Sequence, residues 1–235
     1  MAQNEYEDLY VPDIVPEDDL RYFRQGGYGA RMGWGNSPAV LVVDMMEKFT
    51  RSDQFGRSEP AQEAIENLKK LLDEARSTGT PILYTKLPSD PTLSQAYSGI
   101  IGKKKDKSKK KTEHESTSES DTNSIVPKLQ PAEDDIVIVK STIDGFFDTP
   151  LANVLRRKGI DTLVVTGAST SGGVRATTTG AICNDFRVVV PKECVTDRSM
   201  ISHDISLFDI DMKYGDVASL SEVVEKLRSY PAESA

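Results

Sequence analysis

Three positions in this 235-residue sequence lie where a folded chain usually places reactive groups. Asp44 and Lys140 each follow directly on an apolar run. The third position is Gly173, in the small-residue segment 166–177 (TGASTSGGVRAT), which leads from another apolar run into a helix-like stretch. Free N–H groups and the positive end of a helix dipole meet in such a loop, which suits a nucleophile or a bound anion. Alone, an Asp after a strand is often a cap and a Lys often reaches solvent, but together they predict one pocket.

Five apolar runs predict the strands that would carry these positions. They lack polar alternation, which fits strands covered on both faces. The runs are 39–43, 81–85, 136–139, 162–165 and 187–190. Helical patterns follow at 61–77, from Pro150 behind a Thr149 cap, at 174–185 and at 221–229. The alternation predicts an α/β fold, a Rossmann-like three-layer sandwich with a mainly parallel central sheet, whose strand C-termini share one ligand-binding edge.

Two segments fall outside this pattern. Residues 1–36 read as an N-terminal arm that packs on the domain or on a neighbouring subunit, and the domain proper follows over 37–235. Residues 102–124 contain seven lysines between Lys103 and Lys111, then a Ser/Thr/Glu-rich tract. This composition cannot bury enough apolar surface to fold, so we expect a disordered insertion. A nuclear-localisation or nucleic-acid role for the lysines is the alternative to a solvated loop.

Composition narrows the class of protein. Hydrophobic residues make up 37% and charged residues 28% of the chain, as in ordinary globular domains. The net charge of −8 argues against nucleic acid as a partner. No apolar run reaches the about 18 residues of a membrane span, and residues 1–20 lack the apolar core of a secretory signal. The two cysteines form no disulfide framework, so we predict a cytoplasmic protein.

The order of these segments resembles the isochorismatase-like cysteine hydrolases over nearly the whole domain, and most closely the N-carbamoylsarcosine amidase branch. The matching segments are 31–40 (RMGWGNSPAV), Asp44, 140–149 (KSTIDGFFDT), 166–177, 196–198 (TDR) and 208–217 (FDIDMKYGDV). The 166–177 loop and the Asp-Ile-Asp segment (209–211) are the most discriminating of the segments that carry this resemblance. In that family the loop would contain Thr-Ser-Gly-Cys-Val-Arg, so Gly173 stands in the place of the nucleophilic cysteine.

The resemblance implies a role for each position of the site. The carboxylate equivalent to Asp44 takes the thiol proton and later delivers it to the leaving amine. The lysine equivalent to Lys140 orients that carboxylate and stabilises charge. Backbone N–H groups of the loop around Gly172 would hold the oxyanion, and a cis peptide bond is implied at Ala168–Ser169.

Substrate recognition is also implied by the resemblance. In the carbamoylsarcosine-type enzymes an arginine at the place of Arg198 binds the substrate carboxylate, a task that a planar guanidinium suits. The alternative is an ordinary surface or salt-bridged arginine. Thr170 and Ser169 would add hydroxyl or amide contacts to the same group. The resemblance further implies a homo-oligomer with the N-terminal arm at an interface.

We predict no metal and no cofactor. The related nicotinamidases bind an ion through an Asp-x-His pair and a second histidine, whereas Asp53-Gln54-Phe55 lacks the histidine. The two histidines of the chain are His114, in the insertion, and His203. No glycine-rich phosphate loop follows a strand at the spacing that nucleotide binding requires.

Gly173 leaves three functions open. The first is an amidase, acting on a linear C–N bond of a carboxylate-bearing amide or ureido substrate, whose nucleophile has been replaced. The second is a cysteine-independent isochorismatase-type enzyme, which cleaves a vinyl ether with the Asp as general acid. The third is a non-catalytic protein for small-molecule binding or assembly. Because the loop reads like that of the amidases, we predict the amidase lineage with strongly impaired activity.

Neither cysteine is expected to replace the missing nucleophile. Cys183 lies ten residues beyond Gly173 on one predicted helix, about 15 Å along its axis. We expect Cys183 to be a buried core residue and Cys194 to be structural as well.

Overall fold

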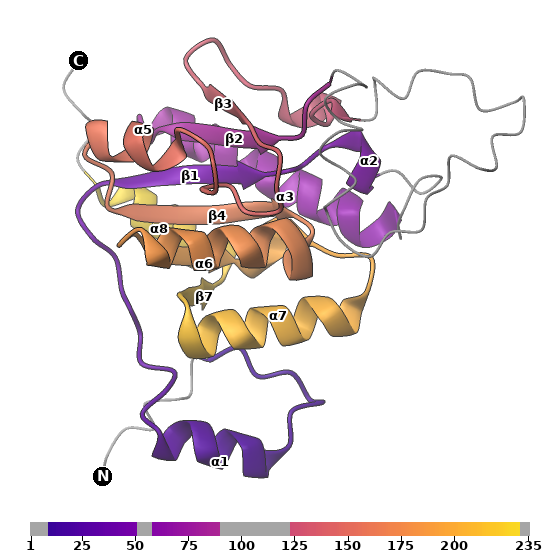
Figure 1. The fold of residues 1–235 in the computed structure, drawn as a ribbon, viewed down its shortest axis with the longest axis vertical. Helices are drawn as coiled ribbons and strands as arrows, with labels where there is room; N and C mark the ends of the chain where they lie inside the picture. The colour runs from indigo at the N-terminus through magenta and orange to yellow at the C-terminus, as the bar shows by residue number, and fades with distance from the viewer. Residues whose placement is uncertain (1–8, 51–57, 90–122, 231–235) are drawn as a thin grey trace, which may run out of the picture.

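A parallel sheet forms the centre of the computed structural model, which describes residues 9–50, 58–89 and 123–230 (Figure 1). The strand order is β3-β2-β1-β4-β5-β7, and a short strand, β6, lies beside β4. Every strand pair in this described sheet runs parallel. The strands are β1 (Pro38–Val43), β2 (Ile82–Lys86), β3 (Ile136–Val139), β4 (Thr162–Ala168), β5 (Arg187–Pro191), β6 (Val195–Thr196) and β7 (Asp216–Ala218). The predicted mainly parallel sheet is confirmed.

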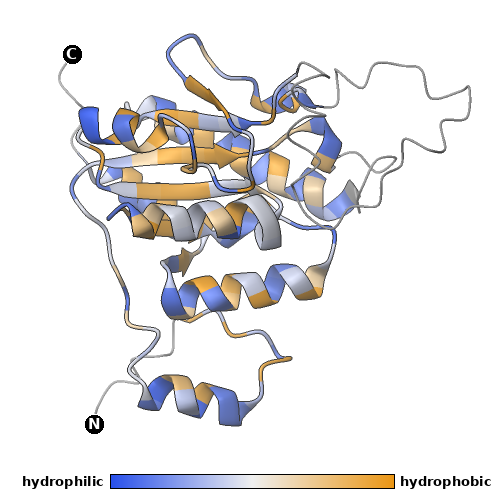
Figure 2. Cartoon of the chain, in the orientation of Figure 1, coloured by the Kyte–Doolittle hydropathy of each residue, from blue (hydrophilic) through white to orange (hydrophobic). Residues whose placement is uncertain are grey.

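Helices cover both faces of the sheet. Along β1, Ala39, Leu41 and Val43 point into the apolar core shared with α5 (Leu151–Arg157), α6 (Arg175–Cys183) and α7 (Met200–Lys213). The alternate residues, Val40 and Val42, point into the opposite core, which is shared with α3 (Ser58–Ser77) and α8 (Leu220–Arg228). Figure 2 shows the apolar strands between helices of mixed hydropathy. The predicted three-layer sandwich is therefore confirmed.

The sheet edge departs from expectation at β3. All six side chains of β1 are buried, as a strand covered on both faces requires. In β3, however, Val137 is 42% and Val139 is 55% exposed. The expectation that this apolar run would be covered on both faces was wrong: β3 is an end strand of the described sheet, and within the described residues Ile138 is the member of the strand that is buried in an apolar core.

The helices also differ from the sequence prediction in detail. Helix α5 begins at Leu151, whose N–H donates to the Thr149 hydroxyl at 3.3 Å, one residue later than expected. The helix predicted from position 174 is preceded by a π-helical turn, Thr170–Val174, which is kinked at Gly172 (φ −112°, ψ −107°, outside the helical region) and continues as α6. No part of α7 was predicted to be helical. Buried polar residues such as Ser206 and Asp211 blur its apolar periodicity.

The N-terminal arm lies against its own domain. It contains α1 (Glu17–Gln25), which packs beyond α7 on the side away from the sheet (Figure 1). Phe23 of α1 and Phe208 of α7 make an edge-to-face contact with their ring centroids 5.5 Å apart. Arg31 donates to the buried carboxylate of Asp211 at 2.8 Å, which fixes the end of the arm that leads into β1.

Most of the predicted insertion, residues 102–122, lies outside the described residues. No helix within the described parts of the chain is long and apolar enough to cross a membrane.

Candidate active site at the strand C-termini

Asp44 lies at the C-terminal end of β1, where its backbone adopts a left-handed conformation with φ of 48°. Its side chain is buried, and Oδ2 lies 2.6 Å from the ammonium nitrogen of Lys140. Oδ1 accepts a hydrogen bond from the Thr85 hydroxyl at 3.1 Å. Thr85 comes from the neighbouring strand β2, whose register places it beside Val43. A strained backbone at a buried charge is a frequent mark of a functional site.

Lys140 follows β3 and is also buried, with 2% exposure. Besides the Asp44 carboxylate, its ammonium donates to the carbonyl oxygens of Thr142 at 2.8 Å and Ile143 at 3.2 Å. An ammonium group has three donors, so these three acceptors fix its position. The cation is therefore held against Asp44 by the loop that follows its own strand.

Burial raises the pKa of the Asp44 carboxyl above its ordinary value. Attraction to the Lys140 ammonium and the hydrogen bonds from Lys140 and Thr85 act in the opposite direction. Desolvation penalises the charged form of a carboxyl, whereas a neighbouring cation favours it. Asp44 is thus suited to hold or release a proton at a higher pH than an exposed aspartate.

Position 173 lies beside this ion pair. Gly173 is buried in the π-helical turn between β4 and α6. A β-carbon built on Gly173 would lie 3.1 Å from Oδ2 of Asp44 and 3.4 Å from the carbonyl oxygen of Ala168. The structure therefore brings together Asp44, Lys140 and the backbone of Gly173, three positions that the sequence places at three strand ends.

The turn follows an unusual stretch of backbone. The peptide bond between Ala168 and Ser169 is cis, at the place that the family resemblance implies. The N–H groups of Gly172 and Val174 donate to the carbonyl oxygen of Ser169, at 2.9 and 3.2 Å. These bonds fold the small-residue loop tightly over the end of β4.

Two buried side chains anchor this loop, and their part in the site was not predicted. His203 of α7 bonds through Nδ1 to the hydroxyl of Thr170 at 2.8 Å. Asp197 accepts from the backbone N–H of Ser171 at 2.8 Å and from its hydroxyl at 2.6 Å. In the sequence, the position of Asp197 within the 196–198 motif could have indicated its part in the site. His203 offered none, because the helix that carries it was not predicted.

The substrate-binding candidates are placed differently from one another. Thr170 is fully buried and its hydroxyl is engaged with His203, so it anchors the loop. Arg198 is exposed and lies next to Asp197, on the segment between β6 and α7. Of these two side chains, Arg198 is thus the one at the surface, and its chain neighbour Asp197 bonds to Ser171 of the loop that contains Gly173.

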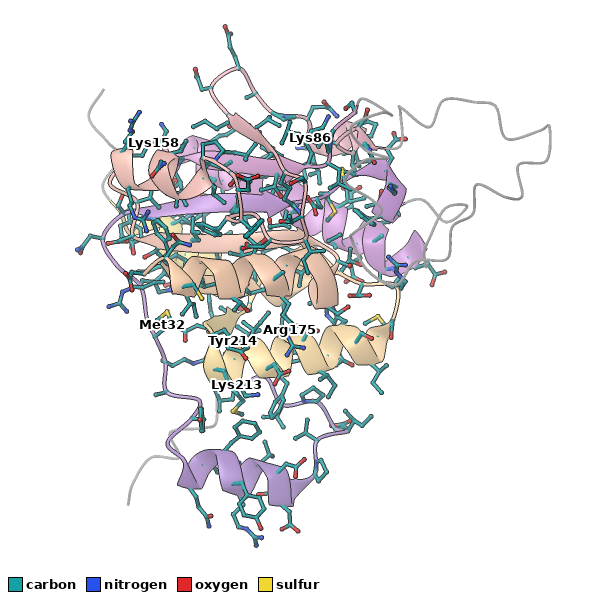
Figure 3. The ribbon with its side chains drawn as sticks, in the orientation of Figure 1. Met32, Lys86, Lys158, Arg175, Lys213 and Tyr214 are labelled. Carbon is teal, nitrogen blue, oxygen red and sulfur yellow. The ribbon has the colours of Figure 1, made fainter. Side chains whose placement is uncertain are left out.

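The start of α6 is also tied to α7. Arg175, the residue after the π-helical turn, reaches toward α7 and bonds to Asp209 at 2.6 Å (Figure 3). Asp209 also bonds Lys213 of the same helix at 2.8 Å. Helix α7 therefore holds the loop and the first turn of α6 from one side.

A cavity of about 610 Å³ opens beside this turn. Ser171 and Gly172 border it, together with the loop after β3 and the length of α6. Asp44, Lys140 and Gly173 do not line it, so the cavity lies next to the buried ion pair without containing it. A proton transfer by Asp44 would therefore take place next to this cavity and not within it.

The two cysteines differ in their exposure. Cys183 is exposed at the end of α6, so the expectation of a buried core residue was wrong. The helix turns its last residue outward. Cys194 is buried, and burial raises the pKa of its thiol. Within the described residues, no cluster of three His, Cys, Asp or Glu side chains could hold a metal ion. Asp53 and His114 lie outside those residues.

We expect Gly167→Ala to be strongly destabilising. Gly167 has φ of 110°, and a β-carbon there would overlap the carbonyl of Val43 in β1. Backbone strain and overpacking together should lower the free energy of unfolding by about 3–5 kcal/mol. The matched control is Gly159→Ala, which has φ of 69° and open space around its β-carbon, so only strain of about 1 kcal/mol is expected. Equal losses in urea unfolding would show that the close approach of β1 and β4 is unimportant.

Known proteins are similar to this chain over most of its length. A model described as "Isochorismatase domain" matches residues 38–222. Maleamate amidohydrolase of Pseudomonas putida is 34% identical over 204 residues, covering 87% of this chain and 93% of that protein. N-carbamoylsarcosine amidase of an Arthrobacter species is 33% identical over 209 residues, covering 89% and 78%. A solved isochorismatase family protein from Desulfovibrio vulgaris shares the fold, with a TM-score of 0.67 at 22% identity, over 83% of this chain and 100% of that one.

Proposed function

The chain belongs to the isochorismatase family of hydrolases, and on this basis we propose that its site is built for a linear C–N bond in a small carboxylate-bearing amide or ureido compound. One observation carries the proposal: the buried Asp44–Lys140 pair lies against position 173. The names of the two similar amidases support the substrate class, because maleamate and N-carbamoylsarcosine each combine a carboxylate with an amide or ureido group.

In this proposal Asp44 transfers the proton, and Lys140 holds the Asp44 carboxylate in place. Asp44 would take a proton from the nucleophile and deliver it to the leaving nitrogen. The Lys140 ammonium, fixed by two carbonyl oxygens, would keep the carboxylate oriented and balance its charge. Backbone N–H groups of the turn that contains Ala168, Ser169 and Gly172 would stabilise the oxyanion, and the N–H of Gly172 would exchange its present bond to the carbonyl oxygen of Ser169 for one to the oxyanion.

Glycine at position 173 supplies no attacking atom, so we propose that the chain hydrolyses such bonds far more slowly than a cysteine-containing relative. A thiolate forms a covalent acyl intermediate and divides one difficult step into two easier ones. Without it the binding groups and the proton-transfer group remain, while the main accelerating step is lost.

Arg198 is proposed to bind the substrate carboxylate, and this can be tested by binding alone. Arg198→Gln should weaken the binding of maleamate and N-carbamoylsarcosine about 10- to 100-fold, because a charge-assisted hydrogen bond contributes about 1.5–3 kcal/mol. Titration calorimetry of the unaltered chain and the variant measures this difference.

The matched control is Arg157→Gln. Arg157 is an exposed arginine at the end of α5, just before the start of β4 and thus at the opposite edge of the sheet from the site. It should leave the affinity unchanged. Equal binding by all three proteins would remove Arg198 from the proposed site, and equal weakening by both variants would indicate a non-specific charge effect.

A second candidate is vinyl-ether hydrolysis, which one observation favours. Burial raises the pKa of Asp44, and a carboxyl that retains its proton can act as a general acid toward a double bond. Such an activity would need no side chain at position 173. Turnover of isochorismate by the unaltered chain, with a rate that falls as Asp44 ionises, would favour this function over the amidase.

A further inference from the structure

Asp197 stands at the edge of the sheet that carries the site. It follows β6, which pairs with the end of β4 so that Thr196 lies beside Ala168. The next residue of each strand therefore leaves the sheet at the same place, Asp197 from β6 and Ser169 from β4. Asp197 is only 6% exposed, so its carboxylate needs hydrogen-bond partners from the protein.

These partners tie the turn that contains Gly173 to the segment between β6 and α7. Oδ2 of Asp197 accepts from the backbone N–H of Ser171 at 2.8 Å and from the Ser171 hydroxyl at 2.6 Å. Oδ1 accepts from the backbone N–H of Ser199 at 3.3 Å. One oxygen thus binds the turn, and the other binds the residue that follows Arg198.

Arg198 therefore lies between two fixed points of the backbone. On one side is Asp197, with its bonds to the turn. On the other side is Ser199, the N-cap residue of α7, whose hydroxyl accepts from the N–H of Ser202 at 3.3 Å. An exposed arginine loses conformational freedom when it binds a ligand, and a backbone that is fixed on both sides of it reduces this cost.

We propose that Asp197 is a positioning residue, whose carboxylate fixes Arg198 relative to the turn that contains Gly173 and so strengthens the binding of a carboxylate-bearing substrate. The inference rests on the proposed function, in which Arg198 binds that carboxylate. Asp197 acts through Arg198 and transfers no proton. Its negative charge repels an anionic ligand, so its benefit has to come from geometry and to exceed that repulsion.

Asp197→Ala should weaken the binding of maleamate about 3- to 10-fold relative to the unaltered chain, the loss expected when one more long side chain must be ordered on binding. A pure charge effect has the opposite sign, because removal of an anion would strengthen the binding of maleamate. Asp197→Asn should stay within about twofold of the unaltered chain, since both bonds from Ser171 go to one oxygen and an amide retains one oxygen acceptor. Titration calorimetry measures each affinity.

The matched control is Asp204→Ala. Burial lowers the pKa of His203, and the carboxylates of Asp204 and Asp197 act in the opposite direction, so both aspartates lie close to the same buried group. Asp204 accepts from the hydroxyl of Tyr10, in the N-terminal arm, at 2.8 Å. Its removal takes away a similar charge and one hydrogen bond while the bonds between Asp197 and Ser171 remain, so the affinity for maleamate should not fall.

A double-variant cycle separates positioning from a general loss of structure. In the Arg198→Gln background, Asp197→Ala should change the affinity for maleamate by less than about twofold, because no guanidinium is left to position. Thermal unfolding shows whether each variant is folded. If Asp197→Ala does not fold, Ser171→Ala takes its place in the cycle: it removes the hydroxyl bond alone and should weaken binding in the same Arg198-dependent way.

Three results would overturn the inference. One is an Asp197→Ala variant that binds maleamate as tightly as the unaltered chain, or more tightly. Another is an equal loss of affinity with and without Arg198. The third is an Asp197→Asn variant that binds as weakly as Asp197→Ala, which would show that the charge matters and the geometry does not.

Failure of this inference can be told apart from failure of the proposed function. If Arg198→Gln lowers the affinity for maleamate and Asp197→Ala does not, the proposed carboxylate-binding site stands and the positioning role is wrong. If the unaltered chain binds neither maleamate nor N-carbamoylsarcosine, the proposed function fails, and the inference fails with it.

Discussion

Gly173→Cys should raise the rate of ammonia release from maleamate or N-carbamoylsarcosine by about 10³-fold or more. Removal of the nucleophile from a well-studied hydrolase costs about 10⁶-fold in kcat, so restoring one to a preserved site should give a large gain. The β-carbon would lie 3.1 Å from Oδ2 of Asp44, which places the thiol within reach of its base. The tight contact with the Val43 side chain requires a shift of a few tenths of an ångström.

The gain should depend on both the thiol and Asp44. Gly173→Ser is the matched control, because it adds a side chain of similar size whose hydroxyl is a far weaker nucleophile at neutral pH. Adding Asp44→Asn to Gly173→Cys should abolish the gain, and iodoacetamide should inactivate the single variant. If Gly173→Cys does not hydrolyse amides, ureas or vinyl ethers, the result would instead favour a protein that binds a small molecule without acting on it.

Lys140→Met should lower the free energy of unfolding at pH 7 by about 3–5 kcal/mol. The variant leaves the buried Asp44 carboxylate without its cation, and breaking a buried pair from one side typically costs this much. The carbonyl oxygens of Thr142 and Ile143 lose their donor as well. Urea unfolding of the two proteins measures the difference. A loss below about 1 kcal/mol would mean that the pair behaves like an exposed salt bridge.

The pH dependence of this loss should identify Asp44 as its cause. Burial already raises the pKa of Asp44, and removing Lys140 raises it further, whereas an unfolded aspartate titrates at about 3.9. A raised carboxyl pKa favours the folded state while the carboxyl is protonated. The stability is therefore fully present below the unfolded pKa and lost as pH rises through the folded pKa. The Lys140→Met defect should be small near pH 4 and largest at neutral pH.

The double variant Asp44→Asn/Lys140→Met supplies the reference for this titration. It has neither charge, so its stability should exceed that of Lys140→Met at pH 7 and match it more closely near pH 4. The difference between the two variants cancels the titration of other carboxyl groups. A difference that does not change with pH would exclude Asp44 as the titrating group.

The central layer of the fold could be predicted from the sequence. The apolar runs that became β1 and β4 are continuous because both faces of those strands are buried, and this leaves a clear local signal. The strand ends also fix where Asp44 and Lys140 emerge, because parallel strands bring their C-termini to one edge. The small-residue loop around Gly173 could also be predicted, because its composition and its place after a strand are local properties of the sequence.

The partners of these residues were decided only by the tertiary structure. The same kind of apolar run became an exposed end strand at β3, because coverage depends on distant helices and not on the run itself. Thr85 bonds to Asp44 through the register of a neighbouring strand, and His203 supports Thr170 from a helix whose buried polar residues hide its periodicity.

The sequence by itself therefore determined which residue types stand at the strand ends, including a glycine at the position where the family resemblance places the nucleophile. The tertiary structure decided that Lys140 comes within 2.6 Å of Asp44 and that both are shielded from water. The physical reason is that strand formation and chain order are encoded over a few neighbouring residues. The proximity and the pKa of a buried pair arise instead from side chains about 100 positions apart in sequence, packed into one low-dielectric space.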